Sequence, residues 1–297
     1  MKTEISKREL GNDLLYDTLS ALYKTLSRLH LPLYIVGATA RDITMLILGE
    51  TEAKRKTMDL DVAVAIPDWQ KFDEIQESLL GNHFIKLKPK QKFSYLGENG
   101  DNDYEVDIVP FGGVSENEEI RWRPDGIPVM SVKCFNDVMQ NAIEVRIGKM
   151  PVRIASLSGQ FLIKLDAWLD RNDRTMKDAY DMMYILSLYY DVRAVVEGIT
   201  PPSSVDLNVE DNSDGLIILG AMWLADDISH QLSIEHLQYY AEILARELGY
   251  GADSRLIVQC YKSVPKDSKL TFEDVYSAWE RIRLGLEREM EIKKCLR

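Results

Sequence analysis

The segment DLDVAVAI, residues 59–66, constrains the fold of this chain more than any other stretch. Its alternating apolar residues predict a β-strand, and on a strand Asp59 and Asp61 point to the same side. Two like charges on one face repel each other, and strands disfavour aspartate. The pair therefore indicates either a solvated strand face or a set of carboxylates that binds cations.

Composition limits the classes of partner that the chain can bind without help. With 48 acidic and 36 basic residues the net charge is −12, so nucleotides or nucleic acids must bind through a local basic patch or bound cations. Three scattered cysteines without a CxxC pair indicate neither a disulfide framework nor a zinc site. The charged start MKTEISKREL lacks a signal-peptide core, and no apolar run approaches membrane-spanning length, so we expect a cytoplasmic protein without a membrane partner.

The 297 residues are enough for two domains, and the predicted elements change character near residue 155. We therefore expect one domain at 1–155, with mixed helices and strands, and a helical domain at 156–297. Helices are predicted at 11–30, 67–80, 216–230, 233–248, 253–263 and 271–292, and one more follows the turn at Gly37 and ends near Gly49. Strands are predicted at 59–66, 83–88, 91–96, 104–111 and 142–154, and a short strand precedes Gly37. A charged loop is predicted at 50–57 and an acidic loop at 200–215.

Two further segments extend the first observation. In YIVGATARD, Gly37 follows a short strand and begins a helix, so backbone amides can approach an anion closely, and Thr39 adds a hydroxyl at the same turn. In YEVDIVPF, Asp107 lies on a later strand. If that strand pairs with the first, three carboxylates gather where hard divalent cations take oxygen ligands.

The run VGATARDITMLILGETEAKRKTMDLDVAV, followed by EVDIV, resembles the signature of nucleotidyltransferases related to DNA polymerase β. Their signature is a Gly-[Gly/Ser] turn, an acidic pair around one apolar residue, and a third acidic residue on a later strand. The run is also similar to the start of tRNA CCA-adding enzymes, although the motif that follows the catalytic strands there is missing here. Ala38 stands where the superfamily has Gly or Ser, which leaves open a catalytically inactive nucleotide-binding or interaction module of the same fold.

The segment SGQFLIKLDAWLDRNDRTMKDAYDMMYIL is similar to the third and fourth motifs of AbiEii-type nucleotidyltransferase toxins. These belong to the type IV toxin–antitoxin group, which includes the MenT tRNA-modifying toxins. Lys164 and Arg171 are two helical turns apart, and Asp178 and Asp181 also share one helix face. The alternative is an exposed lysine and two solvated aspartates paired with neighbouring basic residues.

The resemblance implies an α+β fold with a nucleotidyltransferase-type mixed sheet and flanking helices, followed by an all-α C-terminal domain. It implies a cleft between the domains that holds an NTP and two Mg²⁺ ions, with Mn²⁺ as an alternative. The expected catalytic residues are Asp59, Asp61, Asp107 and Lys164, of which the three aspartates are also the metal ligands. The expected nucleotide-binding residues are Gly37, Ala38, Thr39, Arg41, Arg171, Asp178 and Asp181.

The implied reaction transfers NMP from ATP, GTP or CTP to a hydroxyl acceptor and releases pyrophosphate. Asp107 would help to deprotonate the acceptor, and Lys164 would neutralise charge on the leaving group. The toxin resemblance favours tRNA or another macromolecule as acceptor and an antitoxin protein as partner. The acidic composition fits a small hydroxylated acceptor, such as an aminoglycoside, more easily.

Overall fold

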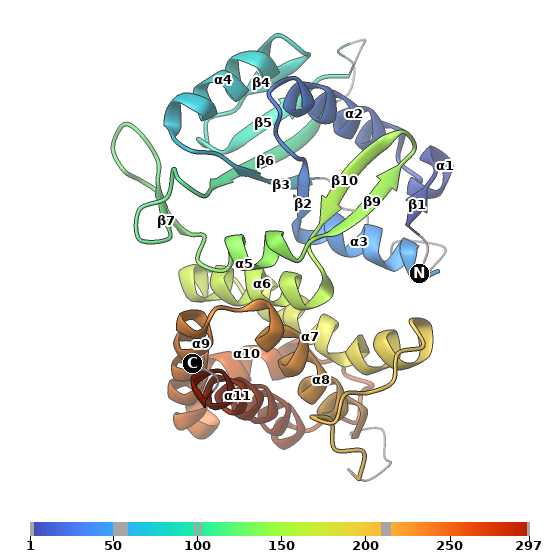
Figure 1. Ribbon diagram of the computed structural model, residues 1–297, viewed down its shortest axis with the longest axis vertical. Helices are drawn as coiled ribbons and strands as arrows, with labels where there is room; N and C mark the ends of the chain where they lie inside the picture. Colours follow the sequence, from blue (N-terminus) through green and yellow to red (C-terminus); the bar gives the residue numbers. More distant parts are fainter. Residues whose placement is uncertain (1–2, 50–58, 98–99, 101–102, 209–214, 296–297) are drawn as a thin grey trace. The chain divides into compact units, whose positions relative to one another are not determined.

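The chain divides into two compact units, Met1–Ser156 and Leu157–Arg297, here called the sheet unit and the helical unit (Figure 1). The computed structural model describes residues 3–49, 59–97, 100, 103–208 and 215–295. The predicted charged loop at 50–57 and part of the predicted acidic loop at 200–215 lie outside the described residues. No helix in the described ranges is long and apolar enough to cross a membrane.

The sheet unit is built on an eight-stranded mixed sheet with the strand order β1-β9-β10-β2-β3-β6-β5-β4. Its strands are β1 (Glu4–Ile5), β2 (Tyr34–Val36), β3 (Asp59–Ala65), β4 (Phe84–Lys86), β5 (Lys92–Tyr95), β6 (Tyr104–Phe111), β9 (Ile143–Ile147) and β10 (Met150–Ile154). At its centre β3 pairs antiparallel with β2 and parallel with β6. Leu60, Val62 and Val64 of β3 are completely buried, so the apolar face of this strand forms core and the other face carries the aspartates.

Helices flank this sheet, as Figure 1 shows. They are α1 (Lys7–Leu10), α2 (Asp13–Arg28), α3 (Gly37–Ile47), α4 (Trp69–Leu80) and α5 (Phe135–Gln140). Helix α2 contacts α4, β6 and β10, while α3 contacts β1, β2 and β3. Side chains cap the two longest helices of this unit, α2 and α4: Asn12 accepts from the Leu15 amide at 3.0 Å, and Asp68 accepts from the Lys71 amide at 2.9 Å. These caps explain why α2 and α4 begin slightly after the predicted starts.

One predicted element of the sheet unit is wrong. The single strand expected at 142–154 is an antiparallel hairpin of β9 and β10. Gly148 lies in the left-handed region at φ +58°, where the chain reverses, and Met150 then pairs with Ile147. A separate two-stranded sheet, β7 (Glu119–Arg121) and β8 (Val129–Ser131), was not predicted, because strands of three residues show too little alternation.

In the described residues the helical unit contains six α-helices. They are α6 (Leu157–Arg171), α7 (Lys177–Asp191), α8 (Gly215–Gln231), α9 (Ile234–Gly249), α10 (Arg255–Ser263) and α11 (Phe272–Cys295). Helix α8 packs against both α7 and α11. Trp168, Trp223 and Trp279 are buried in this unit. The fold class is therefore confirmed: a mixed sheet with flanking helices, followed by an all-α region.

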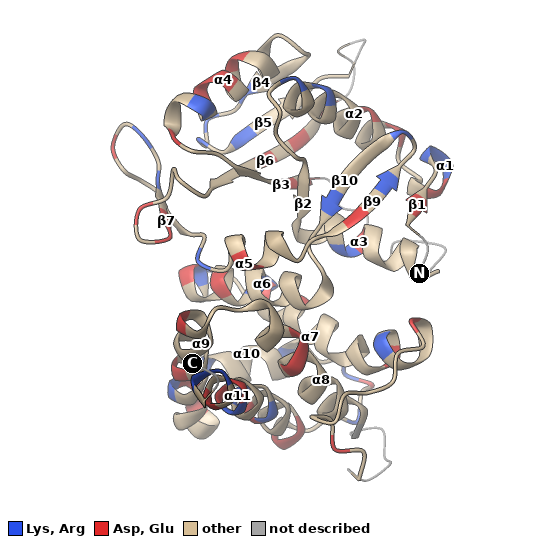
Figure 2. Ribbon diagram, in the orientation of Figure 1, with Lys and Arg blue, Asp and Glu red and all other residues tan. Residues whose placement is uncertain are grey.

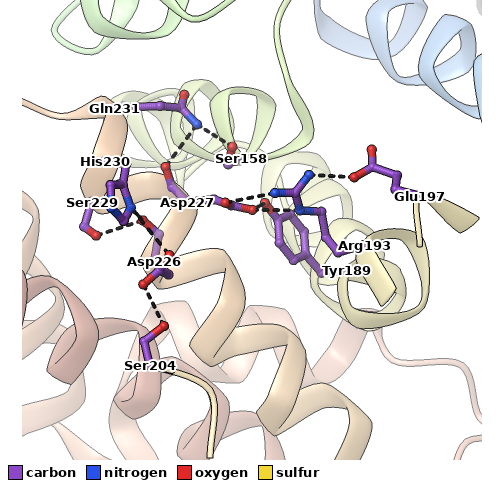
Figure 3. Close-up of polar contacts among 10 residues, drawn as sticks. All are labelled: Ser158, Tyr189, Arg193, Glu197, Ser204, Asp226, Asp227, Ser229, His230 and Gln231. Carbon is purple, nitrogen blue, oxygen red and sulfur yellow. Dashed lines mark hydrogen bonds and ion pairs between the residues drawn. The ribbon is translucent and has the colours of Figure 1, made fainter. Parts of the chain in front are cut away.

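A polar network joins the end of α7 to α8 inside the helical unit (Figure 3). The Tyr189 hydroxyl donates to Asp227, and Arg193 Nε lies 3.1 Å from the same carboxylate. Arg193 also donates to Glu197 at 2.6 Å across the π-helical turn Val192–Val196. Burial raises the pKa of Tyr189 well above its ordinary value, and the Asp227 carboxylate raises it further, so the phenol stays protonated as a donor. The network connects the π-helical turn to the core.

The close contact of α8 with α11 predicts a large cost for enlarging Gly285. A Cβ at this position would lie 2.6 Å from the Ala225 Cβ, so Gly285→Val should lower the free energy of unfolding by about 1–3 kcal/mol through overpacking. Urea denaturation followed by circular dichroism measures this. The matched control is Gly249→Ala at the end of α9, where a Cβ meets nothing within 4 Å. A Gly285 variant as stable as this control would contradict the packing.

Candidate active site

The pairing of β3 with β6 brings four acidic residues to one face of the sheet. The strands are parallel, with Asp59 opposite Glu105 and Asp61 opposite Asp107. Laterally paired residues of a sheet point to the same side, so the four carboxylates share a face. Lys92 of β5 is paired with Asp107 from the other side of β6. Figure 2 shows a basic segment on β5 and acidic segments on the neighbouring β6. The result is an acidic row of Asp59, Asp61, Glu105 and Asp107 on two neighbouring strands, with Lys92 beside it on the third.

The glycine turn is held directly against this row. Val36 pairs with Asp61, and Gly37 follows at φ +65°, in the left-handed region. A Cβ at Gly37 would lie 2.0 Å from the Asp61 Oδ2 atom, closer than any two such atoms can approach. Only glycine therefore allows the first turn of α3 to lie against the Asp61 carboxylate. The free amides of a helix N-terminus lie beside a carboxylate, where a cation-bound phosphate can be held.

The side chains of two residues of the same turn are buried and contact other groups of the protein. Thr39 is 2% exposed, and its hydroxyl donates to the Asp59 carbonyl at 3.2 Å. Arg41 is also buried, and its guanidinium contacts Asp42 at 3.2 Å. In this arrangement the Thr39 hydroxyl connects α3 to β3 and does not point to solvent. Ala38 is half-buried between Gly37 and Thr39.

The third carboxylate is held by a lysine. Lys92 Nζ lies 3.2 Å from Asp107 Oδ1 and 2.9 Å from Glu105 Oε2. Burial raises the pKa of Asp107, and the Lys92 ammonium offsets only part of that effect. Burial also works to lower the pKa of Lys92, but hydrogen bonds and attraction from Glu105 and Asp107 outweigh it and raise the pKa. Lys92 is therefore a charged partner of the acidic row.

A phenol beside this row remains a hydrogen-bond donor. The pKa of Tyr104, at the start of β6, rises to about 12, first because of burial and then because of the nearby carboxylates of Asp59, Asp42 and Asp61. An ionised phenol would add another negative charge near these carboxylates. Tyr104 therefore stays neutral across the physiological range.

The row suits a hard divalent cation by the chemistry of its donors. Asp59, Asp61 and Asp107 offer only oxygen, the ligand that Mg²⁺ and Mn²⁺ prefer. Asp107 Oδ1 is buried, and no well-aligned hydrogen bond from the described residues reaches it. In the described part of the chain no three His, Cys, Asp or Glu side chains are grouped closely enough to hold a metal ion. The strands therefore align oxygen donors of a suitable kind on one face, but the described side chains do not gather around one point, and Asp107 contacts Lys92.

The helical unit contains a second buried group of charges, between α6 and α7. Lys164 Nζ lies 2.7 Å from Asp181 and 3.6 Å from Asp178. Arg171 makes two parallel contacts of 2.7 Å with Asp178 through Nε and Nη2. Asp178 is completely buried and Asp181 is 8% exposed, so the alternative of solvated aspartates is wrong. All four residues predicted from this motif are in one ion-pair network.

Two residues of the acidic face were not among the predicted site residues. Lys92 begins the short strand KFSY, and nothing local distinguishes it from an ordinary edge-strand lysine. Its only signal is its position in an antiparallel partner of the strand that carries Asp107. Glu105 was visible as an acidic residue two positions before Asp107, and its role beside Lys92 follows only from the pairing.

The comparisons with known proteins identify the class of enzyme. Residues 20–199 match the model of a family described as "Nucleotidyl transferase AbiEii toxin, Type IV TA system". The match covers more than half of the chain, which therefore belongs to the AbiEii nucleotidyltransferase family, as the two motifs predicted. The protein is a nucleotidyltransferase.

Three solved structures show more distant similarity. The antibiotic-resistance factor ANT(2'')-Ia is 16% identical, with a TM-score of 0.36 over 61% of this chain and 87% of that chain. A CCA-adding enzyme in complex with ATP is 13% identical, with a TM-score of 0.30 over 96% and 71%. The CdnE c-di-GMP synthase from Capnocytophaga granulosa is 10% identical, with a TM-score of 0.28 over 93% and 81%. No curated protein sequence matches the chain.

The raised pKa of Asp107 predicts how Asp107→Asn changes stability with pH. Folding favours the protonated form of this carboxyl, so its contribution to stability is present at low pH and is lost as the pH rises through the raised pKa. Asparagine cannot ionise and loses nothing. The free energy of unfolding of the variant minus that of the wild type should therefore increase from acid to neutral pH in urea titrations. Asp73→Asn, exposed on α4, is the control; a difference that falls with pH would contradict the assignment.

Removing the charge of Asp178 should destabilise the helical unit. Asp178→Asn weakens both contacts with Arg171 and leaves Lys164 with Asp181 alone. We expect a loss of about 2–3 kcal/mol, less than for a fully buried pair because Arg171 is half exposed. Chemical denaturation measures the loss. Asp173→Asn is the control, since that side chain is 64% exposed; equal effects of the two variants would rule out a structural role for the network.

Proposed function

We propose that this nucleotidyltransferase transfers NMP from an NTP to a hydroxyl acceptor and releases pyrophosphate. The observation that carries the proposal is the row of Asp61 and Asp107 on paired strands, with Gly37 held against the Asp61 carboxylate. In the reaction the acceptor oxygen forms a bond to the α-phosphorus while the bond from that phosphorus to the pyrophosphate oxygen breaks. Bound Mg²⁺, as two ions, or Mn²⁺ in its place, would supply positive charge for the triphosphate and for the attacking oxygen.

The sheet unit is the proposed catalytic domain. Asp59 and Asp61 are the proposed ligands for the cations that hold the triphosphate, and Asp107 is the third ligand. Asp107 also accepts the proton that leaves the acceptor hydroxyl. The Gly37 and Ala38 amides hold the terminal phosphates at the start of α3. We propose that Thr39 and Arg41 act by fixing this turn, since their side chains are buried.

The helical unit contributes Lys164 in this proposal. Its ammonium neutralises charge that develops on the pyrophosphate leaving group. Asp181 and Asp178 hold the ammonium at 2.7 and 3.6 Å, and Arg171 fixes Asp178 in turn. These contacts fix the direction of the ammonium, which is what a positioned cation requires.

The family description favours a macromolecular acceptor. We propose tRNA or another macromolecule as the acceptor, the toxin component of a type IV pair as the biological role, and an antitoxin protein as the functional partner. The net charge of −12 favours a second candidate, a small hydroxylated acceptor such as an aminoglycoside, because a polyanionic RNA is repelled by an acidic surface. The experiment that identifies the acceptor also identifies the donor among ATP, GTP and CTP.

Transfer of label from each α-³²P-labelled NTP tests the reaction and its acceptor. Purified protein with Mg²⁺ is incubated with total tRNA, with an aminoglycoside mixture, and with neither. We expect label on tRNA. Label on the aminoglycosides alone would favour the small-molecule candidate, and no transfer to any acceptor with any NTP would contradict the proposal.

Asp61→Asn should lower the rate of transfer by roughly 100-fold or more, because it removes one of the carboxylates that organise the charged transition state. Lys164→Met should lower kcat by a similar factor and change the KM for NTP less, as expected for a group that acts on developing charge. Lys262→Met on α10 is the matched control, an exposed lysine outside both charge networks. Full activity of either site variant would contradict the role proposed for that residue.

A further inference from the structure

Lys92 contacts two carboxylates of the acidic row and has no part in the proposed reaction. Its ammonium lies between two carboxylates of one strand, 2.9 Å from Glu105 and 3.2 Å from Asp107. The antiparallel register of β5 and β6, which places Lys92 opposite Asp107, enforces this position. The Lys92 side chain is 26% exposed and that of Asp107 is 20% exposed, so water screens their contact only in part.

Lys92 compensates charge on a face that is otherwise acidic. Asp59, Asp61, Glu105 and Asp107 share this face, and like charges on neighbouring strands destabilise a sheet. A cation beside Asp107 lowers that repulsion. In the proposed function Asp107 would hold a divalent metal ion, and the Lys92 ammonium lies 3.2 Å from one of the two oxygens of this carboxylate.

A metal ion and an ammonium cannot both contact that oxygen without strong repulsion. Glu105 offers Lys92 a second anchor, which is 48% exposed and already the nearer partner. Lys92 can thus leave Asp107 and keep a full ion pair with Glu105. The exchange would leave the Asp107 carboxylate available to the metal ion.

We propose that Lys92 is a positioning residue that occupies Asp107 until a divalent cation displaces it toward Glu105, so that the Lys92–Glu105 pair sets the affinity of the row for metal. This inference rests on the proposed function, because it takes Asp107 as a metal ligand. It adds a determinant of metal affinity on a strand that carries none of the three aspartates. The same pair would set the Mg²⁺ concentration at which the enzyme becomes active.

The test is a titration of Mn²⁺ without nucleotide, followed by the electron paramagnetic resonance signal of the free ion. Lys92→Met keeps the length of the side chain and removes the competing charge, so Mn²⁺ affinity should rise roughly tenfold. Lys92→Arg keeps the charge and should stay within about threefold of the wild type. Lys71→Met is the matched control: Lys71 is 25% exposed and pairs with Glu74 at the same 2.9 Å, on α4. If Lys92→Met does not fold, Lys92→Gln takes its place.

A double-mutant cycle separates the anchor role of Glu105 from its charge alone. Glu105→Gln should weaken Mn²⁺ binding about tenfold in the wild type, because Lys92 then stays on Asp107. In the Lys92→Met background the same change should weaken it less than about threefold. Equal effects in both backgrounds, or an unchanged or weaker affinity in Lys92→Met, would overturn the proposal.

Failure of the proposed function gives a different result. Wild-type protein that binds no Mn²⁺, or an Asp107→Asn variant that binds it as well as the wild type, would contradict the metal site itself. Wild-type binding that Asp107→Asn weakens, together with no effect of Lys92→Met, would overturn only the role of Lys92.

Discussion

The contact between the Gly37 backbone and the Asp61 carboxylate is the constraint on which the sheet unit depends. The left-handed conformation at Gly37 and the missing Cβ allow α3 to begin against β3 at Asp61, on the acidic face. Thr39 strengthens this arrangement, because its hydroxyl connects the same turn to the backbone of β3. A helix N-terminus and a carboxylate are thereby held together without a flexible linker between them. This is a rigid way to place phosphate-binding amides beside cation ligands.

Each of the two units places one lysine between two carboxylates. In the sheet unit Lys92 contacts Glu105 and Asp107, and in the helical unit Lys164 contacts Asp178 and Asp181. The two groups differ in how firmly they are held. Asp178 is completely buried and has two further contacts with Arg171, whereas Glu105 is exposed and has only a strand register to position it. The helical network is therefore suited to fix a charge, and the sheet network is suited to exchange one.

Much of the fold could be predicted because its elements are long and strongly periodic. The helices of the second unit and the strand at 59–65 lie close to their predicted positions, because their apolar faces follow the helical and strand periods closely. The hairpin β9–β10 was missed because both of its strands alternate apolar and polar residues and together predict one strand, although Gly148 marks the reversal between them. The short strands β7 and β8 and the helix α5 were missed because so few residues carry no measurable period.

The sequence by itself determined the residue types of the candidate site, their order and the enzyme family, because a glycine turn, an acidic pair and a later acidic residue are local patterns. It could not determine what those residues contact. Lys92 contacts Asp107 because two strands pair in one register, and the Thr39 hydroxyl is buried because α3 packs on β3. Asp178 and Asp181 are buried ion-pair partners instead of surface charges because α6 and α7 pack together. Such contacts depend on the register and packing of segments distant in the chain, and only the tertiary structure specifies these.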